Sequence, residues 1–294
     1  MSASLRQVRR RIKSVEGTKK MTHAMEMVAA AKLKRLQDLL ACSNRYISEL
    51  ARMLRTLVRE KPLAHPLLAE RAEVKRTLVF LITSDTGLCG SYNSNVIDRA
   101  NQFLTSRGFT SSIQFITLGR NGAAYLKRNK QTVLRELAIP RPQQVDGMIR
   151  EVTKIATESF ANQETDETVF IYTHVQSLAS LKPRICMLFP IESSIPQEPQ
   201  GFFEPVPVDY ILEPDLDQIL EIILPEYIET TVAQFVKHAL VAEQASRMMA
   251  MRQATDNAKK MIDSLTLLRN KVRQATITKE LIEVVSGSRA QKER

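Results

Sequence analysis

The chain has 294 residues, is 44% hydrophobic and carries a formal net charge of +10. That hydrophobic content is enough for a core, which excludes a globally disordered chain. The longest apolar runs, such as the seven residues 77–83, are too short to span a bilayer, and the first residues lack the apolar core of a secretory signal. Cys42, Cys89 and Cys186 are widely separated, which excludes a disulfide framework and a cysteine zinc site.

The positive charge lies at one end of the chain. Residues 1–61 hold 15 Lys and Arg against 5 Asp and Glu, whereas the remaining residues are balanced. A local excess of cations indicates an acidic partner for this segment. Nucleic acid and an acidic protein surface are both candidates.

Glycine and proline divide the chain into three parts. Residues 1–61 contain no proline and one glycine, residues 226–286 contain neither, and all twelve prolines lie between 62 and 225. Because these residues interrupt helices and form turns, both ends are predicted to be long helices around a compact middle. We expect an N-terminal helix over 1–61, an inserted domain over 62–214 with a proline-rich connection from 190, and a C-terminal helix over 215–294.

The first helix carries a heptad pattern. Alternating steps of three and four residues from Leu5 give apolar residues at twelve of sixteen positions to Leu57, with Lys19, Thr22 and Glu26 as a polar cluster. There the apolar side chains are predicted to move to Met21, Met25 and Val28. A helix of this length, roughly 90 Å, indicates a coiled coil.

The last helix supplies the expected partner. The same steps from Ile228 reach Met249, and a displaced seam begins at Met251 and continues through Ala254, Ala258, Met261, Leu265, Leu268, Val272, Ala275 and Ile282. Small side chains allow close approach, and methionine tolerates an imperfect fit. We interpret the methionines as packing residues, with a contact role as the alternative, and expect an antiparallel pair.

The middle segment has an α/β pattern. Strands are predicted at 77–85, 112–119, 167–175 and 185–191, and helices at 93–107, 121–130 and 145–162. Strands alternating with helices favour a parallel, Rossmann-like sheet. The predicted fold is therefore an inserted α/β domain on a long antiparallel coiled coil.

No motif for catalysis, cofactor binding or metal binding is found in this sequence. The turn after the first strand, DTGLCGS, lacks GxGxxG, there is no GxxxxGK[ST], and GRNG at 119–122 is interpreted as a tight turn. The four histidines have no metal-ligand spacing, and Asp85 is expected to form hydrogen bonds within its own turn. We therefore expect a non-catalytic protein without cofactor or metal.

Four blocks of sequence resemble the gamma subunit of F-type ATP synthases. They are TKKMTHAMEMVAAAKLKRLQ (18–37), SDTGLCGSYNSN (84–95), EQASRMMAMRQATDNAKKMI (243–262) and NKVRQATITKELIEVVSGS (270–288). The blocks occur in order and cover both ends of the chain. The last fits the family pattern I-T-x-E-x-x-E-x-x-x-G from Ile277 to Gly287.

The resemblance implies a central rotor shaft for ATP synthesis and ion transport. Its expected partners are the alpha and beta subunits, the epsilon subunit and the ring of c subunits, without nucleic acid and without direct insertion into the membrane. The location implied is the cytoplasmic face of a bacterial or equivalent energy-transducing membrane. Partner contacts are expected at Arg9, Arg10, Met25, Asp85, Cys89, Arg247, Arg273, Gln274, Thr278 and Glu280.

Two residues depart from the family pattern. Thr86 stands where the family usually has Arg, and Ser288 stands where it usually has Ala. The turn with Thr86 lies near acidic loops of beta in the family, so one ion pair is not expected here. The cysteine insertion of chloroplast gamma subunits is also missing, which argues against redox control by that route.

Three other functional classes are alternatives. A basic coiled coil that binds nucleic acid explains the charge, but aromatic residues are only 5% of the chain. A Rossmann enzyme would bind nucleotide through its middle domain, and a structural homodimer would elute as a dimer, whereas a self-paired shaft would be monomeric outside its complex.

Overall fold

The computed structural model describes residues 3–60, 65–68, 71, 73–108, 112–178, 180–191 and 215–292. The chain divides into two compact units, which we describe separately. Unit 1 comprises Met1–Ala30 and Arg247–Arg294, and unit 2 comprises Ala31–Ser246. Most of the predicted connection over 190–214 lies outside the described residues.

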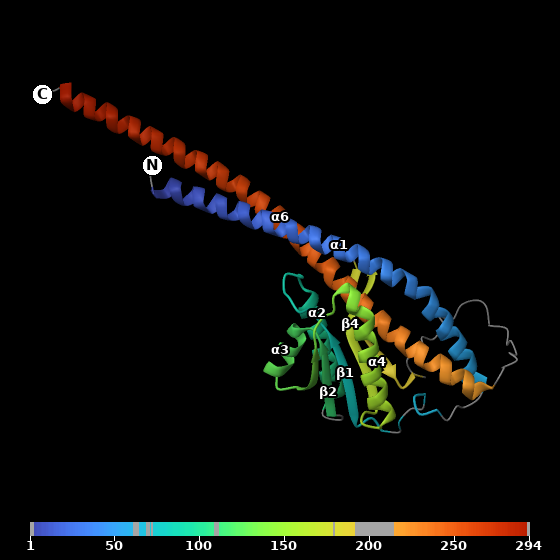
Figure 1. Ribbon diagram of the computed structural model, residues 1–294. Coiled ribbons are helices and arrows are strands. Elements are labelled where there is room, and N and C mark those ends of the chain that lie inside the picture. The colour runs from blue at the N-terminus through green and yellow to red at the C-terminus, as the bar shows by residue number, and fades with distance from the viewer. Residues whose placement is uncertain are drawn as a thin grey trace, which may run out of the picture. The chain divides into compact units, whose positions relative to one another are not determined.

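The secondary structure follows the predicted alternation of helices and strands. In chain order the elements are α1 (Ala3–Glu60), β1 (Arg76–Ile82), α2 (Tyr92–Arg107), β2 (Ser112–Leu118), α3 (Arg120–Arg128), β3 (Thr132–Leu137), the short 3₁₀ helix η1 (Pro142–Gln144), α4 (Val145–Ala161), β4 (Glu167–Ser177), β5 (Ser180–Phe189) and α6 (Leu216–Lys292) (Figure 1). The two long helices are confirmed.

Unit 2 contains a five-stranded sheet in the order β3-β2-β1-β4-β5. The first four strands are parallel, and β5 is antiparallel to β4. The prediction of a wholly parallel sheet is wrong for β5, because only Leu178 and the next residue separate it from β4. A parallel pair needs a crossover of a dozen or more residues, so a link this short makes a hairpin. The edge strand β3 was not predicted.

Helices cover both faces of the sheet. On one face Val79 and Leu81 of β1 pack against α2 and α3. On the other face Phe80 stacks on Phe170 of β4, which in turn contacts Phe235 of α6. The period-two alternation of β1 thus places α6 directly on the sheet.

Two glycines close the junction between β2 and α3, where a tight turn was predicted at GRNG. Gly119 has φ of 103°, and a Cβ atom there would lie 2.3 Å from the carbonyl oxygen of Thr83. A Cβ on Gly122 would lie 2.9 Å from Thr83 Oγ1. Both positions require glycine because the backbone passes so close to the end of β1.

Candidate functional site

The described α1 and α6 residues of unit 1 form an antiparallel helix pair (Figure 1). On α1 the predicted stepping is confirmed, since Leu5, Val8, Ile12 and Ala29 are buried. The facing residues of α6 include Met251 and two others that follow at helical spacing, Thr255 and Ala258, all buried. Small side chains, together with the unbranched Met251, therefore form the middle of this seam.

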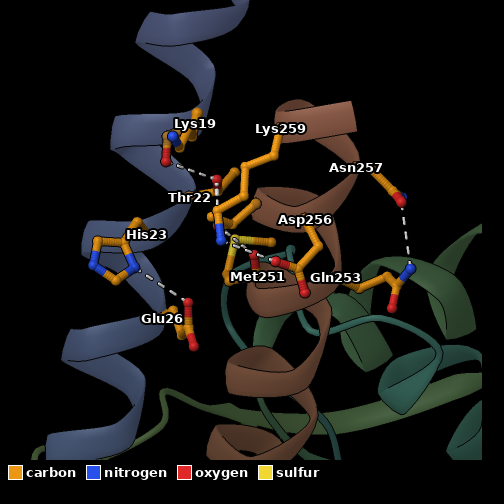
Figure 2. Close-up of polar contacts among 10 residues, drawn as sticks. Lys19, Thr22, His23, Glu26, Met251, Gln253, Asp256, Asn257 and Lys259 are labelled. Atoms are coloured by element: carbon orange, nitrogen blue, oxygen red, sulfur yellow. Dashed lines mark hydrogen bonds and ion pairs between the residues drawn. The ribbon is translucent and has the colours of Figure 1, made fainter. Parts of the chain in front are cut away.

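Two threonine hydroxyls meet in the seam (Figure 2). Thr22 Oγ1 and Thr255 Oγ1 are 2.8 Å apart, and both residues are at least nine-tenths buried. Thr22 also lies 3.1 Å from the carbonyl oxygen of Lys19, and Thr255 lies 2.8 Å from that of Met251. The two hydroxyls have two protons for three contacts, so one contact is always without a proton.

The polar cluster does not displace the seam, which corrects the prediction. Met21, Met25 and Val28 are 61%, 37% and 57% exposed, whereas Thr22 lies in the interface. A threonine can be buried here because its hydroxyl bonds to a carbonyl one turn earlier in its own helix. The three apolar side chains therefore face outward and are available to another surface.

The displaced seam predicted on α6 is confirmed only in part. Met251 and Ala258 are buried, and Ala254, Leu265 and Val272 are half-buried. The remaining predicted members are exposed, namely Met261, Leu268, Ala275 and Ile282. Toward its end α6 makes progressively less contact with α1.

The last turns of α6 extend past the start of α1. Because Thr22 faces Thr255 and the helices are antiparallel, α6 continues for roughly 18 residues, about 27 Å, beyond Ala3. Residues 277–286 are all exposed, including five large apolar side chains, Ile277, Leu281, Ile282, Val284 and Val285. A single helix that exposes this much apolar surface is typical of an interaction site.

Eight of the predicted contact residues lie on unit 1. Arg9, Arg10, Arg273, Gln274, Thr278 and Glu280 are exposed, Met25 is 37% exposed, and Arg247 is half-buried. The other two, Asp85 and Cys89, lie in one loop of unit 2 between β1 and α2.

Asp85 joins three loops at the carboxyl edge of the sheet. Its carboxylate accepts hydrogen bonds from the backbone N–H of Arg120, at 3.0 Å, and of Ile139, also at 3.0 Å. The expectation of bonds within its own turn is wrong, because the partners belong to the segments after β2 and β3. A carboxylate at the first residue of α3 also interacts favourably with the helix dipole.

Cys89 points into unit 2 rather than outward. It is 2% exposed and forms an apolar cluster with Tyr92 of α2 and Ala242 of α6. The exposed tip of the loop is formed instead by residues 86–88. Leu88 at this tip is 57% exposed and has φ of 64°, a strained backbone conformation for leucine.

This cluster lies where a doubly wound sheet would bind a ligand. The chain turns back between β1 and β4, and in open α/β sheets ligands bind at the carboxyl ends of such strands. Here the Cys89 cluster brings α6 against the loop after β1, and the Tyr92 hydroxyl donates to the carbonyl oxygen of Ala239 at 3.2 Å. The protein's own helix thus packs at the place where a Rossmann enzyme holds nucleotide.

Two histidines meet where α6 crosses β4. The rings of His174 and His238 are 4.2 Å apart, and His238 Nδ1 accepts a hydrogen bond from the N–H of Val175 at 3.4 Å. Burial, His174 and the Arg184 cation lower the pKa of His238 to about 4. The ring is therefore neutral at physiological pH and carries its proton on Nε2. Sequence spacing did not reveal this pair, because the two residues are 64 positions apart.

Within the described ranges, no group of three His, Cys, Asp or Glu side chains could hold a metal ion. The same part of the chain has no helix long and apolar enough to cross a membrane.

Comparison with known proteins identifies relatives along the whole chain. A family model described as ATP synthase matches residues 4–290. The ATP synthase gamma chain of Pelotomaculum thermopropionicum is 36% identical over 288 residues, which are 98% of this chain and 99% of that one. The ATP synthase gamma chain of Cupriavidus necator is 35% identical over 294 residues, with 98% and 99% covered.

Solved structures share the fold. A chain from the Euglena gracilis mitochondrial ATP synthase, in the OSCP/F1/c-ring structure of rotational state 3, matches with a TM-score of 0.66 and 18% identity. The match covers 98% of this chain and 94% of that one. A chain of the rotor from the same organism, in rotational state 1, has a TM-score of 0.62 and 17% identity over 93% and 99% of the two chains.

Proposed function

This chain belongs to the ATP synthase gamma chain family, and we propose that it is the central shaft of an F-type ATP synthase. In this role it couples ion-driven rotation of a ring in the membrane to ATP synthesis or hydrolysis on alpha and beta subunits. Its parts are the helix over 1–61, the inserted domain over 62–214 and the helix over 215–294. The shaft has no active site of its own.

The observation that carries the proposal is the length and exposure of α6. This helix runs for 77 residues, with its one internal proline, Pro225, close to its start, and its last part extends past its partner helix in unit 1. A continuous helix can transmit a turning force along its length because every turn is hydrogen-bonded to the next. An exposed apolar stretch at the end of a helix is what a shaft that contacts other subunits requires.

Asymmetry provides the coupling. Within unit 1 the two paired helices have unequal reach and carry different side chains, so the pair presents a different surface in each direction around it. Three surrounding catalytic subunits would therefore meet three different faces, and each would favour a different conformation. A third of a turn then changes which subunit meets which face, and the three states are exchanged.

We propose that unit 1 makes the contacts with alpha and beta. The cationic side chains would meet acidic surfaces, and the outward Met25 would give a soft contact that any rotary position can accept. The proposed contact residues on these helices are Arg9, Arg10, Met25, Arg247, Arg273, Gln274, Thr278 and Glu280. For the loop of unit 2 we propose contact through its exposed tip, with Asp85 and Cys89 holding the tip in place.

The remaining partners follow from the same role. We propose that the inserted domain meets the epsilon subunit and the ring of c subunits, and that the protein is a peripheral member of a membrane complex. We further propose that the protein lies on the cytoplasmic face of a bacterial or equivalent energy-transducing membrane. The proposal includes neither nucleic acid binding nor insertion into the bilayer.

Assembly with the other subunits tests the function. The full chain, produced together with the alpha and beta subunits of its own source, is expected to co-purify with them and to stimulate ATP hydrolysis. A probe attached to the inserted domain is expected to rotate during hydrolysis. A chain that instead eluted alone and shifted DNA in a salt-dependent manner would contradict the proposal and favour the basic coiled coil.

A further inference from the structure

Two kinds of contact hold α6 against the sheet in unit 2. The first is aromatic, since the Phe235 ring lies 5.1 Å from that of Phe170 and 4.9 Å from that of Tyr172. Apolar contacts of this kind have little directional preference, so they hold the helix on the sheet but resist its turning only weakly.

The second kind is directional and involves successive residues of α6. The Tyr92 hydroxyl donates to the carbonyl oxygen of Ala239 at 3.2 Å, and the N–H of Val175 donates to His238 Nδ1 at 3.4 Å. Tyr92 is 3% exposed and His238 is 6% exposed, so water does not readily replace either bond.

The geometry of these two bonds opposes rotation of the helix. Successive residues of an α-helix differ by about 100° around its axis, so the two attachment points face different directions. One bond reaches α2 and the other reaches β4, which are separate elements of the same domain. Turning α6 about its axis would break the bond to Val175, the bond to Tyr92 or both.

We propose that Tyr92 and His238 form a torque clamp, which makes α6 turn together with the inserted domain. This inference rests on the proposed function, because a clamp against turning matters only in a shaft. The role of Tyr92 and His238 is to position the helix, and they take no part in the chemistry. Force entering at the inserted domain would pass through the clamp into α6 and onward along that unbroken helix.

The test is Tyr92→Phe in the assembled complex, with ion pumping and ATP hydrolysis measured together. The change removes one hydroxyl and keeps the ring in the Cys89 cluster. We expect hydrolysis to be retained and ions pumped per ATP to fall. The fraction of complexes in which α6 has turned relative to the inserted domain is expected to rise about fivefold, which corresponds to the loss of one hydrogen bond of about 1 kcal/mol.

Tyr125→Phe is the matched control. Its hydroxyl accepts a hydrogen bond from Asn101 Nδ2 at 2.8 Å, between α3 and α2, so the same chemical change is made in the same domain away from α6. Pumping per ATP is expected to stay normal in this variant. His238→Leu is the second variant and is expected to lower pumping per ATP as Tyr92→Phe does.

A reversible cross-link then separates a clamp from a merely structural contact. Ala242→Cys places a thiol against the native Cys89 across the same interface. Oxidised glutathione can accept two electrons and two protons from these thiols, giving a disulfide and two reduced glutathiones. In Tyr92→Phe the disulfide is expected to restore pumping per ATP, and dithiothreitol is expected to abolish the rescue.

Each alternative result would overturn the inference. These results are normal pumping in Tyr92→Phe, a loss that the disulfide does not repair, a disulfide that fails to form, and failure of both clamp variants to assemble while Tyr125→Phe assembles. A failure of the proposed function is distinguishable, because the unchanged chain would then not co-purify with alpha and beta.

Discussion

Removing the two hydroxyls from the seam of unit 1 gives a sharp test of the packing described there. Thr22→Val and Thr255→Val keep the β-branched shape, and helix propensity changes little. In either single variant the remaining hydroxyl can still donate to its own helix, to Lys19 or to Met251. Each single change loses one hydrogen bond across the seam, which we expect to cost about 0.5–1.5 kcal/mol.

The double variant is expected to recover most of that loss. In the double variant two methyl groups take the places of hydroxyls that lie 2.8 Å apart, and because carbon atoms pack at about 3.5–4.0 Å the two side chains must shift slightly. Apart from that shift, replacing both partners of a buried polar pair by apolar groups of the same shape is nearly neutral. The coupling between the two sites should then be about 1 kcal/mol.

Hydrogen exchange measures this locally. Exchange of peptides covering 15–30 and 248–262 reports the opening of the helix pair without requiring the whole chain to unfold. The expected order of protection is native and double variant together, with both single variants less protected. A double variant destabilised by the sum of the single changes would refute the coupled hydroxyl pair.

Four further outcomes are expected. Changing the three arginines at 9–11 to Gln is expected to weaken assembly or coupling without lowering the thermal stability of unit 2. Normal coupling at all salt concentrations would show that these arginines only contact solvent. Leu268→Pro destabilises the helix by about 3 kcal/mol or more through the backbone alone, since Leu268 is exposed. In assembled complexes this variant is expected to reduce ATP synthesis more than ATP hydrolysis, whereas Leu268→Ala is not. Equal losses of synthesis and hydrolysis would indicate an assembly defect. Met25→Lys is expected to form a charge-assisted bond of roughly 1.5–3 kcal/mol in some rotary positions and to slow the rotor's departure from those positions about tenfold to a hundredfold, which lowers the number of ions pumped per ATP. Met25→Leu is expected to pump normally. Normal pumping by both variants would remove Met25 from the contact surface. His238 has a pKa of about 4 in the folded chain, below its ordinary 6.5, so its contribution to stability is complete above pH 6.5, and up to about 3 kcal/mol of the free energy of unfolding is lost as the pH falls to 4. Urea unfolding of His238→Gln between pH 7 and pH 4 should show a smaller loss. A variant whose stability depends on pH as steeply as that of the native chain would count against this assignment.

The long helices were predictable because their pattern is local. Heptad spacing in α1 gives the buried stripe from Leu5 to Leu57 directly, since one helix face repeats every seven residues. The error at Thr22 arose from treating a hydroxyl as a break in the seam. Its partner, Thr255, is 233 residues away, so no local pattern could show that the two would satisfy each other.

The inserted domain was less predictable where long-range pairing decides the structure. The antiparallel direction of β5 depends on how far β4 and β5 extend toward each other, and the apolar runs marked only their buried parts. The edge strand β3 has no fully buried residue and carries two charged residues, Arg135 and Glu136, so it lacks the pattern of a central strand. The inward position of Cys89 depends on α6 packing against its loop, which only the folded chain reveals.

The helix pair of unit 1 is made from the two ends of the chain, and this has a consequence for biosynthesis. At about 5–20 residues per second, a ribosome that has finished α1 needs roughly 12–46 s to complete α6. Throughout that interval the apolar stripe of the nascent α1 has no partner, and it is open to capture by chaperones or by a neighbouring nascent chain. Premature termination anywhere before about residue 250 would leave that stripe uncovered permanently, so quality control should recognise truncated chains through their intact amino-terminal helix.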